Sequence, residues 1–216
     1  MRVLVIGSTR GTGKLTVEQL ASAGHEVRGM IRDPEQADTV RASGGEPVRG
    51  DLEGDLDGVV DGVDAVAFCA GSGSSTGPDA TLRVDLHGAV RVIDACRDAG
   101  VGRFVMLSAI SADDPMRGNE KIRHYLAAMH ARDRILSDSG LDATIVRPGG
   151  LTHDEGTGKV RIGVPRLEER GSIPRADVAA VIVGCLEEPA TAGAVFELVS
   201  GDTPIADAIA ELRTGA

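Results

Sequence analysis

The sequence predicts an α/β protein built on a doubly wound parallel sheet, with a small C-terminal lobe. Runs rich in Val, Ile and Leu alternate with segments of helical periodicity from residue 2 to about residue 148. A glycine-rich turn joins the first apolar run to the first helical segment. The chain has 216 residues, 42% of them hydrophobic, which is enough for one domain with its own core.

The first part of the chain alternates strands with helices. Strands are predicted at Arg2–Ile6, Glu26–Ile31, Glu46–Arg49 and Ala65–Phe68. Helices are predicted at Thr12–Ala23 and Pro34–Ala42, and an acidic one near Glu53–Asp61. Strands and helices alternating at this pitch form βαβ units, so we expect parallel strands with helices on both faces of the sheet.

The second part continues this pattern and then loses it. A long helix at Asp79–Ala99, a strand at Arg103–Leu107, a helix at Lys121–Ser139 and a strand at Ala143–Val146 are predicted. Glycines and charges fill Gly149–Gly171, followed by a helix near Arg175–Leu186, a strand near Val195–Val199 and a short helix from Pro204. Residues 149–216 are too few for an independent domain. We therefore expect a single domain over residues 1–216, with 149–216 forming a small lobe on the substrate side.

Composition excludes several classes of function. Aromatic residues make up 2% of the chain and the net charge is −10, which argues against nucleic-acid binding. No apolar run approaches the roughly 20 residues that cross a bilayer. The three cysteines match no zinc spacing, and the adjacent His153-Asp154-Glu155 is a poor metal site, so no metal is expected. Unpaired cysteines are typical of a cytoplasmic protein.

The glycine-rich turn carries the strongest chemical signal. It reads Gly7-Ser8-Thr9-Arg10-Gly11-Thr12-Gly13. Glycines let the backbone turn sharply and approach a pyrophosphate, while the N-terminus of the next helix offers unpaired N–H groups and partial positive charge. The turn therefore predicts a dinucleotide cofactor, with the residues of the turn as its candidate ligands. The alternative is a tight strand-to-helix turn without a ligand.

The end of the second strand bears on the choice of cofactor. NAD sites carry Asp or Glu there, about 20 residues after the glycine turn, to bind the ribose hydroxyls. This strand ends in Met30-Ile31-Arg32-Asp33, so a guanidinium stands where the acid is expected. Arg32, assisted by Arg10, favours the 2′-phosphate of NADP. NAD stays open, because Asp33 turned inward would serve its ribose.

These features resemble the short-chain dehydrogenase/reductase superfamily, whose members have a Rossmann fold. The glycine turn is similar to that of its NADPH-dependent reductases. Further segments resemble its small atypical members, including the epimerase-like and NmrA-like groups. They are Gly50-Asp51-Leu52, Phe68-Cys69-Ala70-Gly71-Ser72, Phe104–Ala109, Arg147–Leu151 and Gly201–Ile205. The resemblance covers almost the whole chain and rests on the order of these segments.

The resemblance also implies cofactor contacts beyond the glycine turn. It places Asp51 and Leu52 at the adenine, and Ala70 and Gly71 at the adenosine ribose and phosphates. It places Pro148-Gly149 beside the nicotinamide. These positions follow predicted strands, and ligands of open α/β sheets bind beyond the carboxyl ends of the strands. The alternatives are that Asp51 caps a helix and that Pro148 only ends a strand.

The reaction centre departs from the family pattern. The resemblance implies a Ser that orients a carbonyl, a Tyr that moves the proton, and a Lys four residues later that lowers the tyrosine pKa. Ser108 and Tyr125 match the first two and are the candidate catalytic residues, but Met129 stands in place of the lysine. If the missing lysine limits activity, Met129→Lys should raise carbonyl reduction. Lys121 is either a substitute cation one helical turn before Tyr125 or an ordinary surface residue.

Two classes of function remain open. The first is an NADP-dependent oxidoreductase that reduces a small carbonyl, flavin or quinone-like acceptor. The second is a non-catalytic NADP(H)-binding redox sensor, as among NmrA-like relatives; a sugar-nucleotide epimerase or dehydratase is a weaker third. We expect a small-molecule substrate, no nucleic-acid or membrane partner, and a monomer or a homodimer paired through the helices Asp79–Ala99 and Lys121–Ser139.

Overall fold

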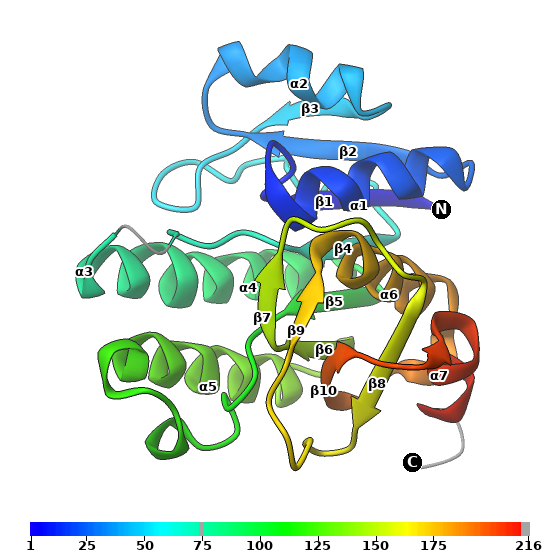
Figure 1. Ribbon diagram of the computed structural model, residues 1–216. Helices are drawn as coiled ribbons and strands as arrows, with labels where there is room; N and C mark the ends of the chain where they lie inside the picture. The colour runs from blue at the N-terminus through cyan, green and yellow to red at the C-terminus, as the bar shows by residue number, and fades with distance from the viewer. Residues whose placement is uncertain (74–75, 213–216) are drawn as a thin grey trace.

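The computed structural model describes residues 1–73 and 76–212, which form a doubly wound α/β fold (Figure 1). Its main sheet has nine strands in the order β11-β8-β10-β6-β5-β4-β1-β2-β3 among the described residues. The parallel strands are β1 (Arg2–Ile6), β2 (Glu26–Ile31), β3 (Glu46–Arg49), β4 (Ala65–Phe68), β5 (Arg103–Leu107), β6 (Asp142–Pro148) and β10 (Val195–Ser200). Antiparallel β8 (Lys159–Gly163) and β11 (Thr203–Pro204) extend one edge.

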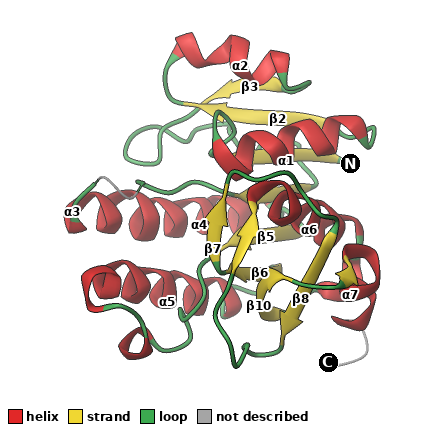
Figure 2. Cartoon of the chain, in the orientation of Figure 1, coloured by secondary structure: helices red, strands yellow, loops and turns green. Residues whose placement is uncertain are grey.

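Helices cover both faces of this sheet (Figure 2). They are α1 (Gly11–Ser22), α2 (Ala37–Ala42), α3 (Pro78–Ala80), α4 (Ala89–Ala99), α5 (Arg123–Ser137), α6 (Arg175–Glu187) and α7 (Ile205–Leu212). A π-helical stretch, Thr81–Gly88, joins α3 to α4, so the predicted helix Asp79–Ala99 is continuous. None of the described helices is long and apolar enough to cross a membrane.

Strand β1 shows why helices must pack on both faces of the main sheet. Val3 and Val5 belong to one buried cluster, which includes residues of α1 and α6. Leu4 and Ile6 belong to a second cluster, which includes residues of α4 and α5. Successive side chains of a strand point to opposite faces, so an unbroken apolar run produces two cores.

The predicted acidic helix near Glu53–Asp61 is wrong, because this segment is a series of turns. The backbone N–H groups of Glu53 and Asp57 donate to the carboxylates of Asp51 and Asp55, bonds that compete with helical ones. Gly58 adopts a φ of +70°, which ends any helical run. The valines of this segment still bury themselves against the second core.

The weakly patterned stretch after Pro148 contributes more sheet than the sequence predicts. Besides β8, it forms β7 (Gly150–Thr152) and β9 (Ser172–Pro174), which pair as a small parallel sheet. Strands of three to five residues are too short to show a clear period. The C-terminal residues therefore extend the main sheet through β10 and β8, and also form a small layer beside it.

A buried arginine fixes the C-terminal segment to the sheet. The Arg103 guanidinium on β5 donates to the carbonyl oxygens of Asp142 (2.6 Å) and Cys185 (2.7 Å) and to the Thr191 hydroxyl (2.7 Å). Burial lowers the pKa of this arginine, since it disfavours the charged form. These bonds connect β5 to the end of α6 and to the turn that precedes β10.

Replacing Arg103 with leucine should therefore lower the free energy of unfolding by about 3 kcal/mol, because buried acceptors lose their donor. Arg97→Leu is the matched control, because Arg97 is exposed and forms only an i,i+3 pair with Asp94. Urea denaturation of both variants measures the effect. Equal, small losses would contradict a structural role for the Arg103 bonds.

Candidate functional site

A cavity of about 280 Å³ lies where the chain crosses from one face of the sheet to the other, between β1 and β4. Residues that follow β1, β2, β3 and β4 line it: Gly7, Thr9, Arg10, Arg32, Asp51, Leu52, Ala70 and Gly71 among others. All eight are candidate cofactor ligands predicted from the sequence. Such a switch point is where open α/β sheets bind ligands.

The glycine turn is shaped by close backbone approaches. Gly7 has a φ of +85°, and a Cβ there would lie 2.7 Å from the Ala70 backbone nitrogen. A Cβ at Gly13 would lie 2.1 Å from the Gly7 carbonyl oxygen, so the turn itself requires this glycine. Ser8 is buried, and its hydroxyl donates to the Met30 carbonyl (2.8 Å). Ser8 and Gly13 thus hold the turn, while Thr9 and Arg10 face the cavity.

Helix α1 begins at Gly11, so its N-terminal N–H groups, including that of the buried Thr12, lie at this turn. The sequence gives no sign of a further cation here. A side chain at Gly11 would begin 3.6 Å from the Arg175 Nε, so Arg175 lies against the turn. The carbonyl oxygens of Leu151 and Thr152 hold its guanidinium at 3.2 and 3.0 Å. Arg175 is distant in sequence and lies in no local motif, so sequence reasoning missed it.

The far end of the cavity carries arginines. Arg32 is 63% exposed, and its Nε lies 3.9 Å from the Asp33 carboxylate. The Gln36 side-chain oxygen accepts from the backbone N–H groups of Arg32 (3.0 Å) and Asp33 (3.2 Å), which fixes this corner. Arg49, the last residue of β3, lines an adjoining cavity with Arg32 and Asp51. Within the described residues, neither Arg10 nor Arg49 forms an ion pair.

The predicted reaction centre lies farther along the same edge. Ser108 is buried after β5, and its hydroxyl donates to Asp133 Oδ2 at 2.8 Å. The same oxygen accepts from Arg147 Nε at 2.9 Å, while Asp133 Oδ1 is buried without a hydrogen-bond partner. Burial raises the pKa of the Asp133 carboxyl, although Arg132 and Arg147 oppose the shift. Pro148 and Gly149 continue the edge, with the Pro148 carbonyl accepting from Ile110 N–H (2.9 Å).

Tyr125 packs beside a small buried cluster that contains Met129. Met129 is fully buried, so the position of the family lysine is core and does not face a cavity. Burial raises the pKa of the Tyr125 phenol, and the nearby charge of Arg132 partly opposes the rise. Arg132 is itself buried, donates to the Asp85 and Leu107 carbonyls, and lies over the Phe68 ring. The structure therefore brings a cation near Tyr125 from two helical turns away.

The alternative cation, Lys121, is not on the helix of Tyr125. Helix α5 begins at Arg123, and Lys121 is exposed in the 3-10 turn Glu120–Ile122 that precedes it. The i,i+4 geometry expected from the sequence is therefore absent.

Comparison with known proteins agrees with this geometry. Residues 7–189 match the NAD(P)H-binding family. The chain belongs to that family. This NAD(P)H-binding protein is 42% identical, over 98% of its chain and 100% of the relative, to an uncharacterised sugar epimerase of Bacillus subtilis. The resemblance to epimerase-like short-chain dehydrogenases and the Rossmann-type fold are both confirmed.

Solved structures support the same assignment. A putative NAD-dependent epimerase/dehydratase of Bacillus halodurans superimposes with a TM-score of 0.95 at 41% identity, covering 98% of this chain and 99% of that one. An anaerobillin reductase of Escherichia coli superimposes with a TM-score of 0.79 at 25% identity, covering 94% and 98%. The NAD(P)H-binding protein thus has both epimerase-like and reductase neighbours.

The burial of Met129 argues against a gain in carbonyl reduction from Met129→Lys. An ammonium placed in this apolar cluster loses its hydration, so the variant should lose about 3 kcal/mol of unfolding free energy and gain no activity. Thermal unfolding and NADPH oxidation check both parts. Met116→Lys, at a 66% exposed methionine, is the control for stability. A stable Met129→Lys protein with raised activity would contradict this assignment.

Asp133 gives a prediction for pH. Its raised pKa means that the folded chain retains a proton that the unfolded chain releases, so its contribution to stability falls as pH rises above about 4. Asp133→Asn removes this dependence. The unfolding free energy of the variant, relative to wild type, should therefore rise steadily from pH 4 upward.

Urea denaturation across this pH range measures the difference. The same substitution at Asp138, which is exposed after the end of α5, is the matched control. If the unfolding free energy of Asp133→Asn minus that of wild type stays constant or falls with pH, ionisation of the buried Asp133 carboxyl does not destabilise the fold.

Proposed function

We propose that this protein is an NADP-dependent reductase that transfers a hydride to a small carbonyl, flavin or quinone-like acceptor. The observation that carries the proposal is the continuous edge of the sheet. It has a cavity lined by the exposed arginines Arg10 and Arg32 at one end, and Ser108 and Tyr125, with Met129 in place of the family lysine, at the other.

The arginines support NADP over NAD. Arg32 follows β2, where the ribose-binding acid of NAD sites is expected, and its contact with Asp33 is long at 3.9 Å. Arg10 and Arg49 approach the same corner from the glycine turn and from β3. A phosphate dianion would satisfy guanidinium donors that are otherwise exposed to solvent. The Asp33 alternative is less favoured, since Asp33 is 60% exposed beside Arg32.

The reaction centre supports an acceptor that needs little help with its proton. Bound NADPH would supply the hydride, and residues of this chain would orient the acceptor. In our proposal the Ser108 hydroxyl, held by Asp133, faces the acceptor, and the Tyr125 phenol supplies the proton. The raised pKa of Tyr125 suits a proton donor better than a base. A flavin or quinone that has accepted the hydride can also take its single proton from water, so it tolerates Met129.

Two other functions agree with fewer of the observed structural features. A sugar-nucleotide epimerase, suggested by the names of the Bacillus relatives, needs a tyrosine that acts as a base and room for a large substrate. Here the described C-terminal residues are used to extend the sheet and cover it. A redox sensor that binds NADP(H) without turnover is the second candidate, and the buried Met129 is the observation that favours it.

Arg32→Asp tests the cofactor assignment. It should weaken NADPH binding tenfold or more, by about the strength of a charge-assisted bond, and leave NADH binding unchanged or improved. Arg41→Asp is the matched control, because Arg41 is 61% exposed and away from the cavity. Thermal midpoints titrated with each cofactor measure affinity by mass action. Equal losses for NADPH and NADH would overturn the 2′-phosphate role.

Steady oxidation of NADPH distinguishes the enzyme from the sensor. Wild-type protein is assayed with riboflavin, a naphthoquinone and a simple aldehyde. Turnover with one of them is the expected result. Tight NADPH binding without turnover of any acceptor would favour the sensor, and no binding at all would reject both functions.

A further inference from the structure

Two loops border the reaction centre on the side away from the cofactor cavity. Loop 109–118 follows Ser108, and loop 164–171 connects β8 to β9. Both adjoin the expected nicotinamide position: Ile110 N–H donates to the Pro148 carbonyl (2.9 Å), and Gly150 N–H donates to the Gly171 carbonyl (2.9 Å). An acceptor bound beside Ser108 would therefore lie against these loops.

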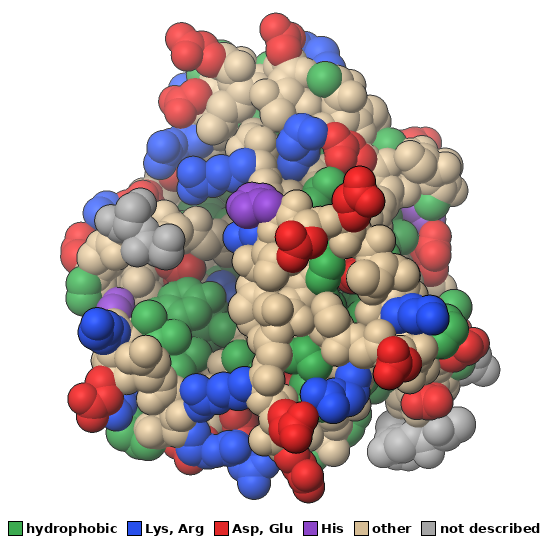
Figure 3. All heavy atoms as spheres, viewed as in Figure 1, with side chains coloured by type: hydrophobic (Ala, Val, Ile, Leu, Met, Phe, Trp, Pro, Cys, Tyr) green, Lys and Arg blue, Asp and Glu red, His purple; other side chains and the backbone are tan. Residues whose placement is uncertain are grey.

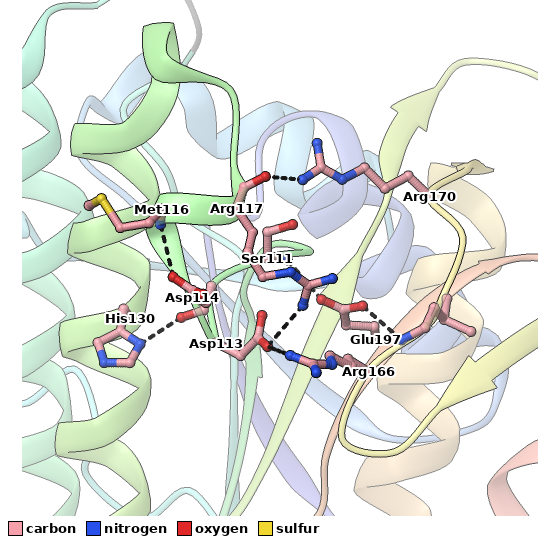
Figure 4. A network of polar contacts seen from close by, with 11 residues as sticks. Ser111, Asp113, Asp114, Met116, Arg117, His130, Arg166, Arg170 and Glu197 are labelled. Atoms are coloured by element: carbon pink, nitrogen blue, oxygen red, sulfur yellow. Dashed lines mark hydrogen bonds and ion pairs between the residues drawn. The ribbon is translucent and has the colours of Figure 1, made fainter.

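Three guanidinium groups gather where the loops meet (Figure 4). Arg166 and Arg117 both approach Asp113 Oδ2, at 3.4 and 3.6 Å. Arg170 donates to the Arg117 backbone carbonyl, which joins the loops a second time. One carboxylate oxygen at these distances leaves most of the guanidinium donors of Arg117 and Arg166 unused, and their side chains are 42% and 52% exposed.

The other acids of these loops do not pair with Arg117 or Arg166. Asp114 accepts from the Met116 backbone N–H, and Glu169 pairs with Arg161 on β8. Glu197 is buried on β10 and accepts from the backbone N–H groups of Ser111 (2.8 Å) and Leu167 (2.9 Å). Among the described residues, Glu168 forms no ion pair. In the part of the chain that the structure describes, Asp113 is therefore the acid that pairs with Arg117 and Arg166, and most of their donors stay available to a ligand.

Apolar side chains lie beside the guanidinium groups of these loops. Met116, Ile122 and Val164 are large hydrophobic residues with exposed side chains in or next to these loops. Leu86, Ala109 and Tyr125 are partly buried against the cluster of Met129. In Figure 3, hydrophobic side chains floor a hollow beside β7, and Lys and Arg side chains lie along its lower rim. The surroundings thus suit an apolar body with one charged end.

We propose that Arg117 and Arg166 form a subsite for a carboxylate carried by an apolar, conjugated acceptor. The carboxylate would take the unused donors of both guanidinium groups, and the body of the acceptor would lie over the apolar residues toward Ser108. This inference rests on the proposed reductase function and adds the substrate class to it: an aromatic or quinone-like carboxylic acid.

The test measures binding without turnover. The protein is saturated with NADP⁺, which carries no hydride to transfer, and equilibrium binding of anthraquinone-2-carboxylate is compared with that of its uncharged carboxamide. Wild-type protein should bind the carboxylate about tenfold more tightly or better, the effect of one charge-assisted contact. Arg117→Gln and Arg166→Gln should each remove most of this preference, and Arg166→Lys should retain part of it.

Arg161→Gln is the matched control. Arg161 is 52% exposed and pairs with Glu169 at 3.6 Å, values close to those of Arg166, but it does not approach Asp113. This variant should keep the wild-type preference. Thermal midpoints confirm that each variant is folded, and Arg166→Lys still tests the subsite if a glutamine variant fails to fold.

The outcomes separate this inference from the proposed function. Equal binding of acid and amide by wild type, or a preference that survives in both glutamine variants, overturns the subsite. The wild-type preference for FMN over riboflavin measures recognition of a phosphate, and the preference for the acid over the amide measures recognition of a carboxylate. If the first preference is the larger, the carboxylate assignment is overturned in favour of phosphate. Acceptor reduction without any preference would leave the reductase intact and reject only the subsite. A preference without NADPH oxidation would support the subsite and reject the reductase.

Discussion

The candidate site depends on how closely the backbone at the end of β1 approaches its neighbours. There is no room for a Cβ at Gly7 against Ala70, or at Gly13 against the Gly7 carbonyl. This contact holds the first turn of α1 against the end of β4 and keeps the helix N-terminus at the carboxyl edge of the sheet. The cavity, the arginines around it and the direction of a bound cofactor all follow from that placement.

Three buried charged residues lie close together at the predicted reaction centre. Arg132, Asp133 and Arg147 lie between α5 and the sheet, where an uncompensated charge is costly. Backbone carbonyls accept from both Nη groups of Arg132, and Asp133 Oδ2 accepts from the Ser108 hydroxyl and from Arg147 Nε, while Arg132 Nε and Asp133 Oδ1 are buried without a hydrogen-bond partner. A cation near the tyrosine is thus retained, but it comes from Arg132 and is fixed by the backbone. This cation opposes the effect of burial only in part, so the pKa of the Tyr125 phenol stays raised, whereas the resemblance implies that the family lysine lowers it.

The sequence predicted what is local and missed what is assembled from distant segments. Strands β1, β4, β5 and β6 could be located because parallel strands buried on both faces contain continuous apolar runs. The prediction of a helix at Glu53–Asp61 was wrong because it relied on composition. Hydrogen bonds from the backbone to the side chains of Asp51 and Asp55 favour turns in this segment. Arg175, Asp133 and Glu197 gave no signal, because each acquires its partner only when the chain folds. Ser108 and Tyr125 were found by order along the chain, and Met129 was understood only once its burial was known.

The buried Glu197 has a consequence for how the protein can change over evolutionary time. It anchors two backbone N–H groups, one of them at Ser111, whose φ of +67° is strained for a residue with a side chain. The anchor belongs to a strand of the sheet and holds main-chain atoms. The strand therefore places part of each loop through main-chain atoms, and the side-chain contacts of Asp113 and Arg170 add to this anchor. Substitution of loop side chains that make no such contact can change the acceptor preference while the cofactor half of the scaffold stays as it is.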